Sequence, residues 1–192
     1  MRIACLVAAS VLAFAAAPAV AAPAAPAAAA QPDVTDAELA SYAAAEEGVR
    51  AVQAQVQGQL TAEQQAAMVA AIEGAGLTLD RFNAISQAVQ AGDEVLAARL
   101  AVARAPESAA GSVGATATDA ELGQFAAAMA AVRPIAEQLN GAAPTAEQQA
   151  AMAEAIASSG LDIERFNAIS AALAGDARLQ ARIALAAARS AG

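Results

Sequence analysis

The stretch Thr61-Ala-Glu-Gln-Gln-Ala-Ala-Met68 decides the fold, because it occurs a second time without change at Thr145 to Met152. A second block, Arg81-Phe-Asn-Ala-Ile-Ser86, recurs as Arg165 to Ser170. In both cases the numbering advances by 84 residues. Self-similarity at a fixed spacing is the signature of a repeated structural unit. The sequence therefore predicts two copies of one unit.

Shorter matches set the limits of the two copies. Thr35 to Leu39 resembles Thr118 to Leu122, and Gly92-Asp93 matches Gly175-Asp176, each at a spacing of 83. We therefore expect a first repeat over residues 35–104 and a second over 118–190. Residues 105–117, rich in Gly, Ser and Ala, are expected to form the linker between them.

The periodicity inside each copy is helical. Apolar residues that recur every three or four positions make one stripe of a helix. The stripe is plain in the second copy, at Leu122, Phe125, Met129, Val132, Ile135 and Leu139. It is weaker in the first copy, at Leu39, Tyr42, Val49, Val52, Val56 and Leu60. No strand-length window alternates with period two, so the fold class is all-α, with three to four helices in each copy.

Capping residues divide each copy into helices. A Thr followed three residues later by Glu or Gln is a capping box, and the residues Thr35, Thr61, Thr118 and Thr145 all begin one. Third and fourth helices are expected to start at Thr78, Asp162, Asp93 and Asp176, and the preceding helices to end at Gly76, Gly160, Gly92 and Gly175. Pro134 should kink or split the first helix of the second copy.

The aromatic residues of the two copies form matched pairs, Tyr42 with Phe125 and Phe82 with Phe166. We expect them to anchor two small cores. Their predicted neighbours are Met68, Ile72, Ile85 and Leu96 in the first copy, and Met152, Ile156, Ile169 and Leu179 in the second. Units of this size are near the lower limit of independent stability, so the copies are expected to pack together or the protein to self-associate.

The N-terminus has the pattern of an export signal. Arg2 precedes the apolar run Ile3 to Phe14, and Ala19-Val20-Ala21 is a small-x-small cleavage site. We therefore expect a cleavable signal peptide at residues 1–21, followed by a disordered Ala/Pro linker at 22–34. The alternative is an uncleaved anchor, but the apolar run is shorter than the ~20 residues that a membrane span needs. The expected location is the periplasm or the extracellular space.

Composition excludes several function classes. There is no His, and the single Cys, Cys5, lies in the predicted signal. The exported chain would therefore lack a thiolate, an imidazole base and the common soft metal ligands. The formal net charge of −9 argues against nucleic acid, which requires clustered positive charge. We expect no enzyme activity, no cofactor, no metal and no stable membrane span.

The most distinctive polar residues are Arg81 and Asn83, with Arg165 and Asn167. One interpretation makes them a polar pair for an unknown protein partner or ligand. The alternative is that they hydrogen-bond neighbouring helix ends. Two further arginines, Arg99 and Arg182, are expected to pair with Asp80 or Glu164.

The order of these motifs resembles the bacterial domain of unknown function 4168, in two tandem copies. The matching stretches are Leu39 to Ala43, Gly76 to Ile85 and Gly92 to Leu100, then Leu122 to Ala126, Gly160 to Ile169 and Gly175 to Ile183. The resemblance implies an exported helical domain and carries no catalytic residues.

A second resemblance is confined to Leu60-Thr-Ala-Glu-Gln64, which is similar to the Leu-Thr-x-x-Gln motif of Spy and CpxP stress chaperones. In the second copy Pro144 replaces the Leu. Our leading hypothesis is a non-enzymatic exported binding module, and the alternative is a periplasmic holdase.

Overall fold

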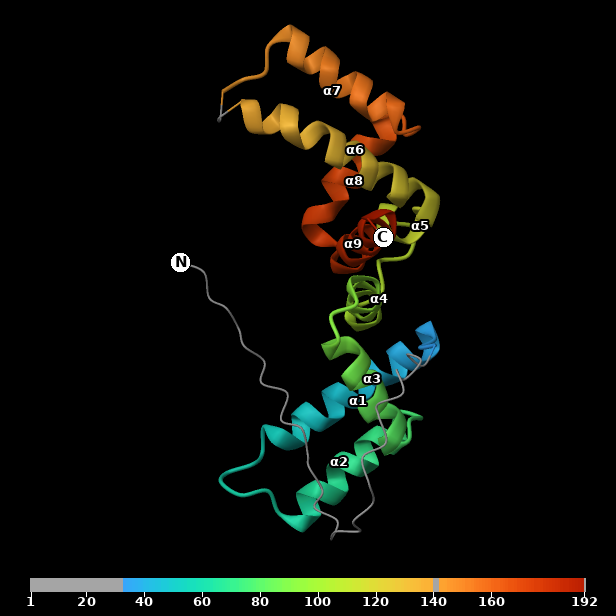
Figure 1. Ribbon diagram of the computed structural model, residues 1–192, viewed down its shortest axis with the longest axis vertical. Helices are drawn as coiled ribbons and strands as arrows, with labels where there is room; N and C mark the ends of the chain where they lie inside the picture. Colours follow the sequence, from blue (N-terminus) through green and yellow to red (C-terminus); the bar gives the residue numbers. More distant parts are fainter. Residues whose placement is uncertain (1–32, 140–141, 192) are drawn as a thin grey trace, which may run out of the picture. The chain divides into compact units, whose positions relative to one another are not determined.

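The computed structural model describes residues 33–139 and 142–191, and over this range the protein is all-α, with no strand (Figure 1). This confirms the predicted fold class. The predicted signal peptide at 1–21, and the predicted linker as far as residue 32, lie outside the described residues.

The helices of the first copy are α1 (Asp36–Gln53), α2 (Ala62–Gly74), α3 (Leu79–Gln90) and α4 (Glu94–Arg104). Those of the second copy are α6 (Asp119–Gln138), α7 (Ala146–Ser158), α8 (Ile163–Ala172), the 3-10 helix η1 (Leu173–Gly175) and α9 (Ala177–Ala191). A single turn, α5 (Val113–Thr116), lies between them. Each helix of the first copy thus has a counterpart in the second.

The helices begin where the capping residues predicted. All four capping boxes form, and in the first of them the Glu38 amide donates to Thr35 Oγ1 over 3.2 Å. Gly76 and Gly160 end α2 and α7 with φ of +86° and +83°, a region that favours glycine. Gly175 differs from Gly92, because α8 continues into η1 and Gly175 is the last residue of that turn.

The four aromatic residues of the two copies lie in or against the two cores, as expected, and they stack within each copy, a contact that the repeat did not predict. Tyr42 stacks on Phe82 with ring centroids 4.8 Å apart, and Phe125 stacks on Phe166 at 4.9 Å. The predicted neighbours Ile72, Ile85 and Leu96 join the core around Tyr42, and Ile169 and Leu179 join the core around Phe125. Met68 and Ile156 are buried outside these two clusters, and Met152 is only partly buried.

Two features of the first helices bear on the predictions. Pro134 lies inside α6, which runs without a break from Asp119 to Gln138, so the predicted split does not occur. Proline removes one amide donor, and the other hydrogen bonds of this 20-residue helix hold it together. In the first copy α1 ends at Gln53, so Val56 and Leu60 lie beyond the helix whose stripe they were expected to continue.

The ends of both predicted linkers pack against the helices. Val34 is buried in the first core, and Ala117 is buried in the second. The turn α5 lies against α8 and α9. A Cβ at Gly114 would lie 1.9 Å from the Asp176 carboxylate, so a larger residue here would displace the Asp176 side chain. Residues 113–117 therefore belong structurally with the second copy.

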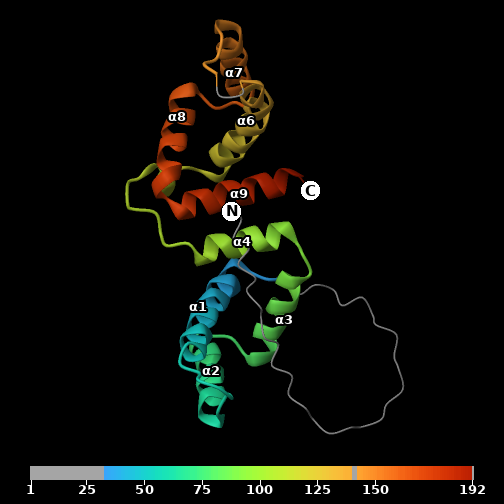
Figure 2. The same ribbon diagram turned by 90° about the vertical axis from the view of Figure 1, so that its left-hand side faces the viewer.

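The packing follows the same order in each copy. In the first, α1 packs against α2 and α4; in the second, α6 packs against α7 and α9. The helix α4 also packs against its counterpart α9, and Figures 1 and 2 both show the two helices side by side. The described helices therefore belong to one compact unit, in which α4 and α9 lie against each other.

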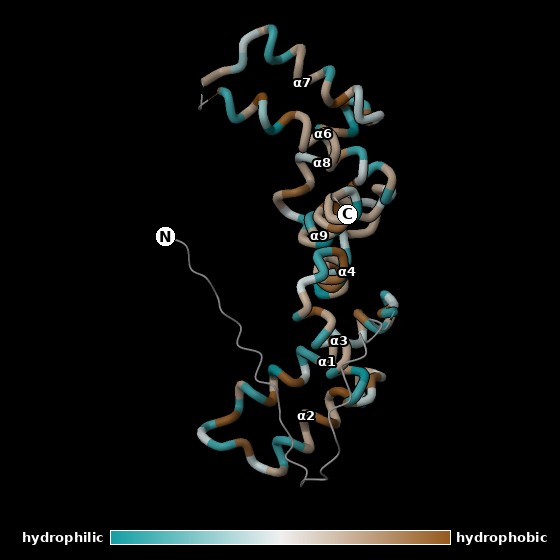
Figure 3. The backbone as a smooth tube through the Cα atoms, in the orientation of Figure 1, coloured by the Kyte–Doolittle hydropathy of each residue, from teal (hydrophilic) through white to brown (hydrophobic). Residues whose placement is uncertain are grey.

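Figure 3 shows that apolar and polar residues are mixed along the described helices. No helix in the described part of the chain has both the length and the apolar character that crossing a membrane would need.

Candidate functional site

The predicted site residues Arg81 and Arg165 lie at equivalent places and make the same contact. Arg81 Nε donates to Glu38 Oε1 over 2.7 Å, and Arg165 Nε donates to Glu121 Oε1 over 2.7 Å. Both carboxylates also accept from the amide of the N-cap threonine, which is Thr35 or Thr118. These arginines join the third helix of each copy to the start of the first helix.

Their predicted partners Asn83 and Asn167 do not join them. Both asparagine side chains are exposed and make no hydrogen bond with the described residues. The structure therefore does not bring Arg and Asn together as a polar pair. The arginine contacts match the alternative interpretation, in which these side chains bond to neighbouring helix ends.

The expected partners of Arg99 and Arg182 are wrong. Arg99 Nη2 lies 2.7 Å from Asp36 Oδ1, and Arg182 Nη2 lies 2.6 Å from Asp119 Oδ1. The physical reason is that the fourth helix packs against the start of the first helix, whereas Asp80 and Glu164 lie on the third.

Each of these two arginines also binds the backbone before the first helix. Arg99 donates to the carbonyl of Val34, and Arg182 donates to that of Ala117. Together with Arg81 and Arg165, they form a duplicated set of arginines at the N-termini of α1 and α6.

A pocket of about 480 Å³ lies beside this set, where α4 meets α9. Its walls come largely from equivalent positions of the two copies. The matched pairs are Asp36 with Asp119, Ala40 with Gly123, Arg99 with Arg182, Val102 with Leu185, and Ala103 with Ala186. The same surface of each copy thus faces the other across the pocket, as in an isologous contact.

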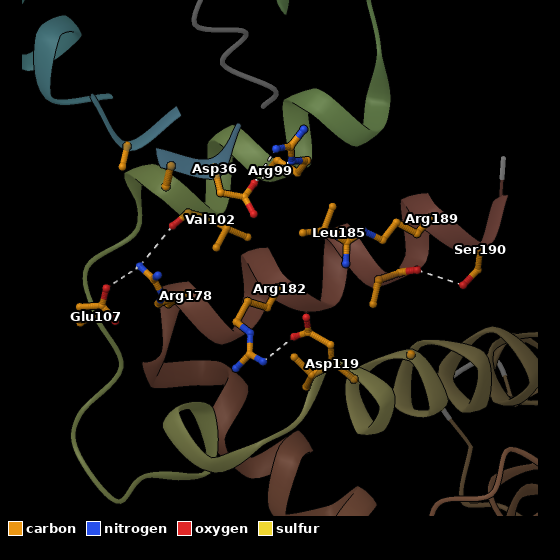
Figure 4. A pocket seen from close by; sticks show the side chains of 15 residues that line it. Asp36, Arg99, Val102, Glu107, Asp119, Arg178, Arg182, Leu185, Arg189 and Ser190 are labelled. Atoms are coloured by element: carbon orange, nitrogen blue, oxygen red, sulfur yellow. Dashed lines mark hydrogen bonds and ion pairs between the residues drawn. The ribbon is translucent and has the colours of Figure 1, made fainter. Parts of the chain in front are cut away.

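Three charged residues of the pocket break this symmetry. They are Glu107, Arg178 and Arg189, and all three are shown in Figure 4. Arg178 stands where the first copy has Val95. Arg178 Nη1 lies 3.1 Å from Glu107 Oε1, but the Glu107 side chain is 83% exposed. Arg189 makes no hydrogen bond or ion pair with any described residue.

The charges therefore do not cancel. The two symmetric Arg–Asp pairs are neutral together, whereas two further arginines are opposed only by Glu107. The pocket has a formal charge of +1 in a chain whose net charge is −9. Four of the ten basic residues of the chain line it.

Arg178 and Arg189 were not among the site residues that the sequence predicted. The sequence feature that could have identified them is a difference between the copies, because these two arginines have no counterpart in the first copy. Their convergence with Arg99 requires α4 to lie against α9, which no local pattern indicates.

Comparison with known protein families, with characterised proteins and with solved structures gave no match. Among residues 33–139 and 142–191, no group of three or more acidic side chains is placed to hold a metal ion.

Proposed function

We propose that this protein is an exported, non-enzymatic binding module built from two tandem helical units. The observation that carries the proposal is the pocket between α4 and α9, which equivalent residues of both copies line. Equivalent residues on both walls are what a binding site shared by two repeats would contain. The pocket volume lies within the range of about 300 to 1,000 Å³ that is usual for small-molecule sites.

A binding role without turnover follows from the side chains available. The pocket contains arginines, three carboxylates and aliphatic residues. Each carboxylate is already paired with an arginine, so it is poorly placed to exchange a proton with a bound molecule. Binding rather than catalysis is therefore the chemistry that these residues serve best.

Export is the second part of the proposal. It is supported by the three-part signal pattern at residues 1–21, and the proposed location is the periplasm or the extracellular space. The resemblance to the domain of unknown function 4168 agrees with an exported helical protein.

A holdase would need a broad exposed apolar face for unfolded clients. Within the described residues only two large hydrophobic side chains are exposed, Met129 at 39% and Ile163 at 45%. They belong to different helices, α6 and α8. The pocket is the stronger candidate, and suppression of client aggregation is the experiment that would favour the holdase instead.

The test uses a variant that fills the pocket. Gly123 lines the pocket within α6, and a Cβ there meets no atom within 4 Å, so Gly123→Leu should fold. The matched control is Gly74→Leu, which makes the same change in α2, outside the pocket, at a position where a Cβ also meets no atom within 4 Å. Wild type and both variants are incubated with an envelope extract of the native host, and small molecules that each retains are identified by mass spectrometry.

We expect that wild type and Gly74→Leu retain the same small molecules and that Gly123→Leu does not retain them. Equal retention by all three proteins would refute a binding role for the pocket. Conversion of a retained molecule into a product by the purified protein would refute the non-enzymatic role.

A further inference from the structure

The geometry points to a ligand class for this pocket: we infer that it binds a monocarboxylate with a hydrocarbon body, such as a medium-chain fatty acid. This inference rests on the proposed function and adds the chemistry of the ligand. Three features support it: the formal charge of the pocket, the arginine N–H groups without a partner among the described residues, and the apolar wall.

The formal charge of the pocket favours a ligand with one negative charge. The formal charge of +1 is compensated by one carboxylate, whereas a phosphate monoester brings about −1.5 to −2 at neutral pH. The acidic remainder of the chain does not prevent binding, because salt screens exposed charges beyond about 8 Å at physiological ionic strength. The local charge around the pocket therefore decides which ion enters.

The arginine donors remain available. Arg189 makes no contact with a described partner, and Arg178 uses only Nη1, toward Glu107 and two backbone carbonyls. The planar guanidinium presents paired N–H groups that match the two oxygens of a carboxylate. In Figure 4 Arg178 extends from α9 toward Val102 of α4 and Glu107, whereas Arg182 extends to Asp119 at the start of α6. A carboxylate in the pocket would form an ion pair with Arg189 and accept its N–H hydrogen bonds.

The apolar wall is built from both copies. Val102 and Ala103 on α4 face Leu185 and Ala186 on α9, and Leu122 contributes from α6. Small side chains on both helices leave the space open, and aliphatic side chains favour a hydrocarbon over a polar ligand. A ligand held here would contact both copies at once.

The experiment is calorimetric titration of the purified protein with decanoate below its micelle concentration. Decanol tests the carboxylate, because it keeps the hydrocarbon chain and lacks the charge. Acetate tests the hydrocarbon, because it keeps the charge and lacks the chain. We expect one site for decanoate and affinities at least about tenfold weaker for the other two probes, since each lacks one of the two interactions.

Two variants with the same change of charge locate the site. Arg189→Ala removes the pocket arginine that has no partner among the described residues, and we expect decanoate to bind about tenfold more weakly, as for the loss of a charged hydrogen bond. Arg133→Ala removes an exposed arginine of α6 that does not line the pocket, and we expect no change. Gly123→Leu should abolish binding.

Three results would overturn the inference: no saturable binding of decanoate, decanol binding as tightly as decanoate, or equal effects of Arg189→Ala and Arg133→Ala. If the envelope extract still yields molecules that Gly123→Leu does not retain, the ligand class is wrong and the binding function stands. If both experiments fail, the pocket is not a binding site.

Discussion

The guanidinium of Arg81 on α3 lies 2.7 Å from the carboxylate of Glu38 on α1, and the pair joins the start of one helix to the start of another. Glu38 also accepts from the amide and the hydroxyl of Thr35. These bonds, led by that from Arg81, lower the pKa of Glu38 to about 2. The equivalent Glu121, bonded to Arg165 and Thr118, also has its pKa lowered to about 2.

The first prediction concerns acid stability. A carboxylate with a lowered pKa in the folded state stabilises the protein above its unfolded pKa, and that contribution is lost as the pH falls through the folded pKa. For Glu38 and Glu121 the window runs from 4.5 down to about 2. The double variant Glu38→Gln, Glu121→Gln should therefore lose less of its thermal stability across this window than wild type does.

The measurement is the melting temperature by circular dichroism at several pH values in that window. The control is Glu63→Gln, Glu147→Gln, which makes the same change of charge at equivalent exposed positions without an ion pair among the described residues. If both double variants keep the pH dependence of wild type, the arginine contacts do not hold these carboxylates ionised.

The second prediction concerns Tyr42, the only tyrosine in a chain without tryptophan, so its phenolate absorbance reports one group. Burial raises the pKa of Tyr42, and the hydrogen bond with Ser86 at 2.9 Å lowers it in part. The folded protein should titrate above the usual value near 10. Ser86→Ala should raise the midpoint further. A midpoint that is the same in the folded and the urea-unfolded protein would contradict burial of the ring.

Local patterns predicted the helices well because the determinants of helix ends are local. A capping box needs only residues three apart, and a left-handed glycine needs only its own backbone. The repeat also identified Tyr42 with Phe125, and Phe82 with Phe166, as equivalent core positions. It did not predict that Tyr42 stacks on Phe82 and Phe125 on Phe166, because these are contacts between different helices.

The pocket could not be predicted in the same way. It depends on α4 lying against α9, a contact between helices that are far apart in the sequence. The partners of Arg99 and Arg182 were predicted wrongly for the same reason, because helix spacing alone does not say which helix end an arginine reaches. The sequence shows that Arg178 and Arg189 have no counterpart in the first copy. Only the packing of α4 against α9 shows that both line one pocket.

The third prediction concerns the crossing of α1 and α2. A Cβ at Gly48 would lie 2.8 Å from the Cβ of Ala71, closer than real Cβ atoms approach. Gly48→Ala should gain about 1 kcal/mol of helix propensity and lose about 1 to 3 kcal/mol from overpacking, a net loss of about 1 kcal/mol in the free energy of unfolding. Gly123→Ala, whose Cβ meets no atom within 4 Å, should be stabilising by about 0.5 to 1 kcal/mol. Urea denaturation measures the free energy of unfolding of both variants. An increase for Gly48→Ala as well as for Gly123→Ala would mean that α1 and α2 move apart at no energetic cost.

The fourth prediction concerns Pro134 inside α6. Proline removes the amide that would bond to the carbonyl four residues earlier, and its ring crowds that carbonyl. The first copy has Ala51 at the equivalent position, so the fold does not require proline here. Pro134→Ala should raise the free energy of unfolding by about 1 to 3 kcal/mol, because it restores the hydrogen bond and the helix propensity of alanine.

Pro144→Ala is the matched control, since Pro144 precedes the N-cap Thr145 and lies outside the helices. Proline there restricts the unfolded chain, so its removal should give no gain and a loss of up to about 1 kcal/mol. Urea denaturation measures both variants. If Pro134→Ala is no more stable than wild type, α6 must already relieve the proline by bending or by a water bound to the free carbonyl. Hydrogen exchange of the amides around residue 134 would then show weak protection that the variant does not restore.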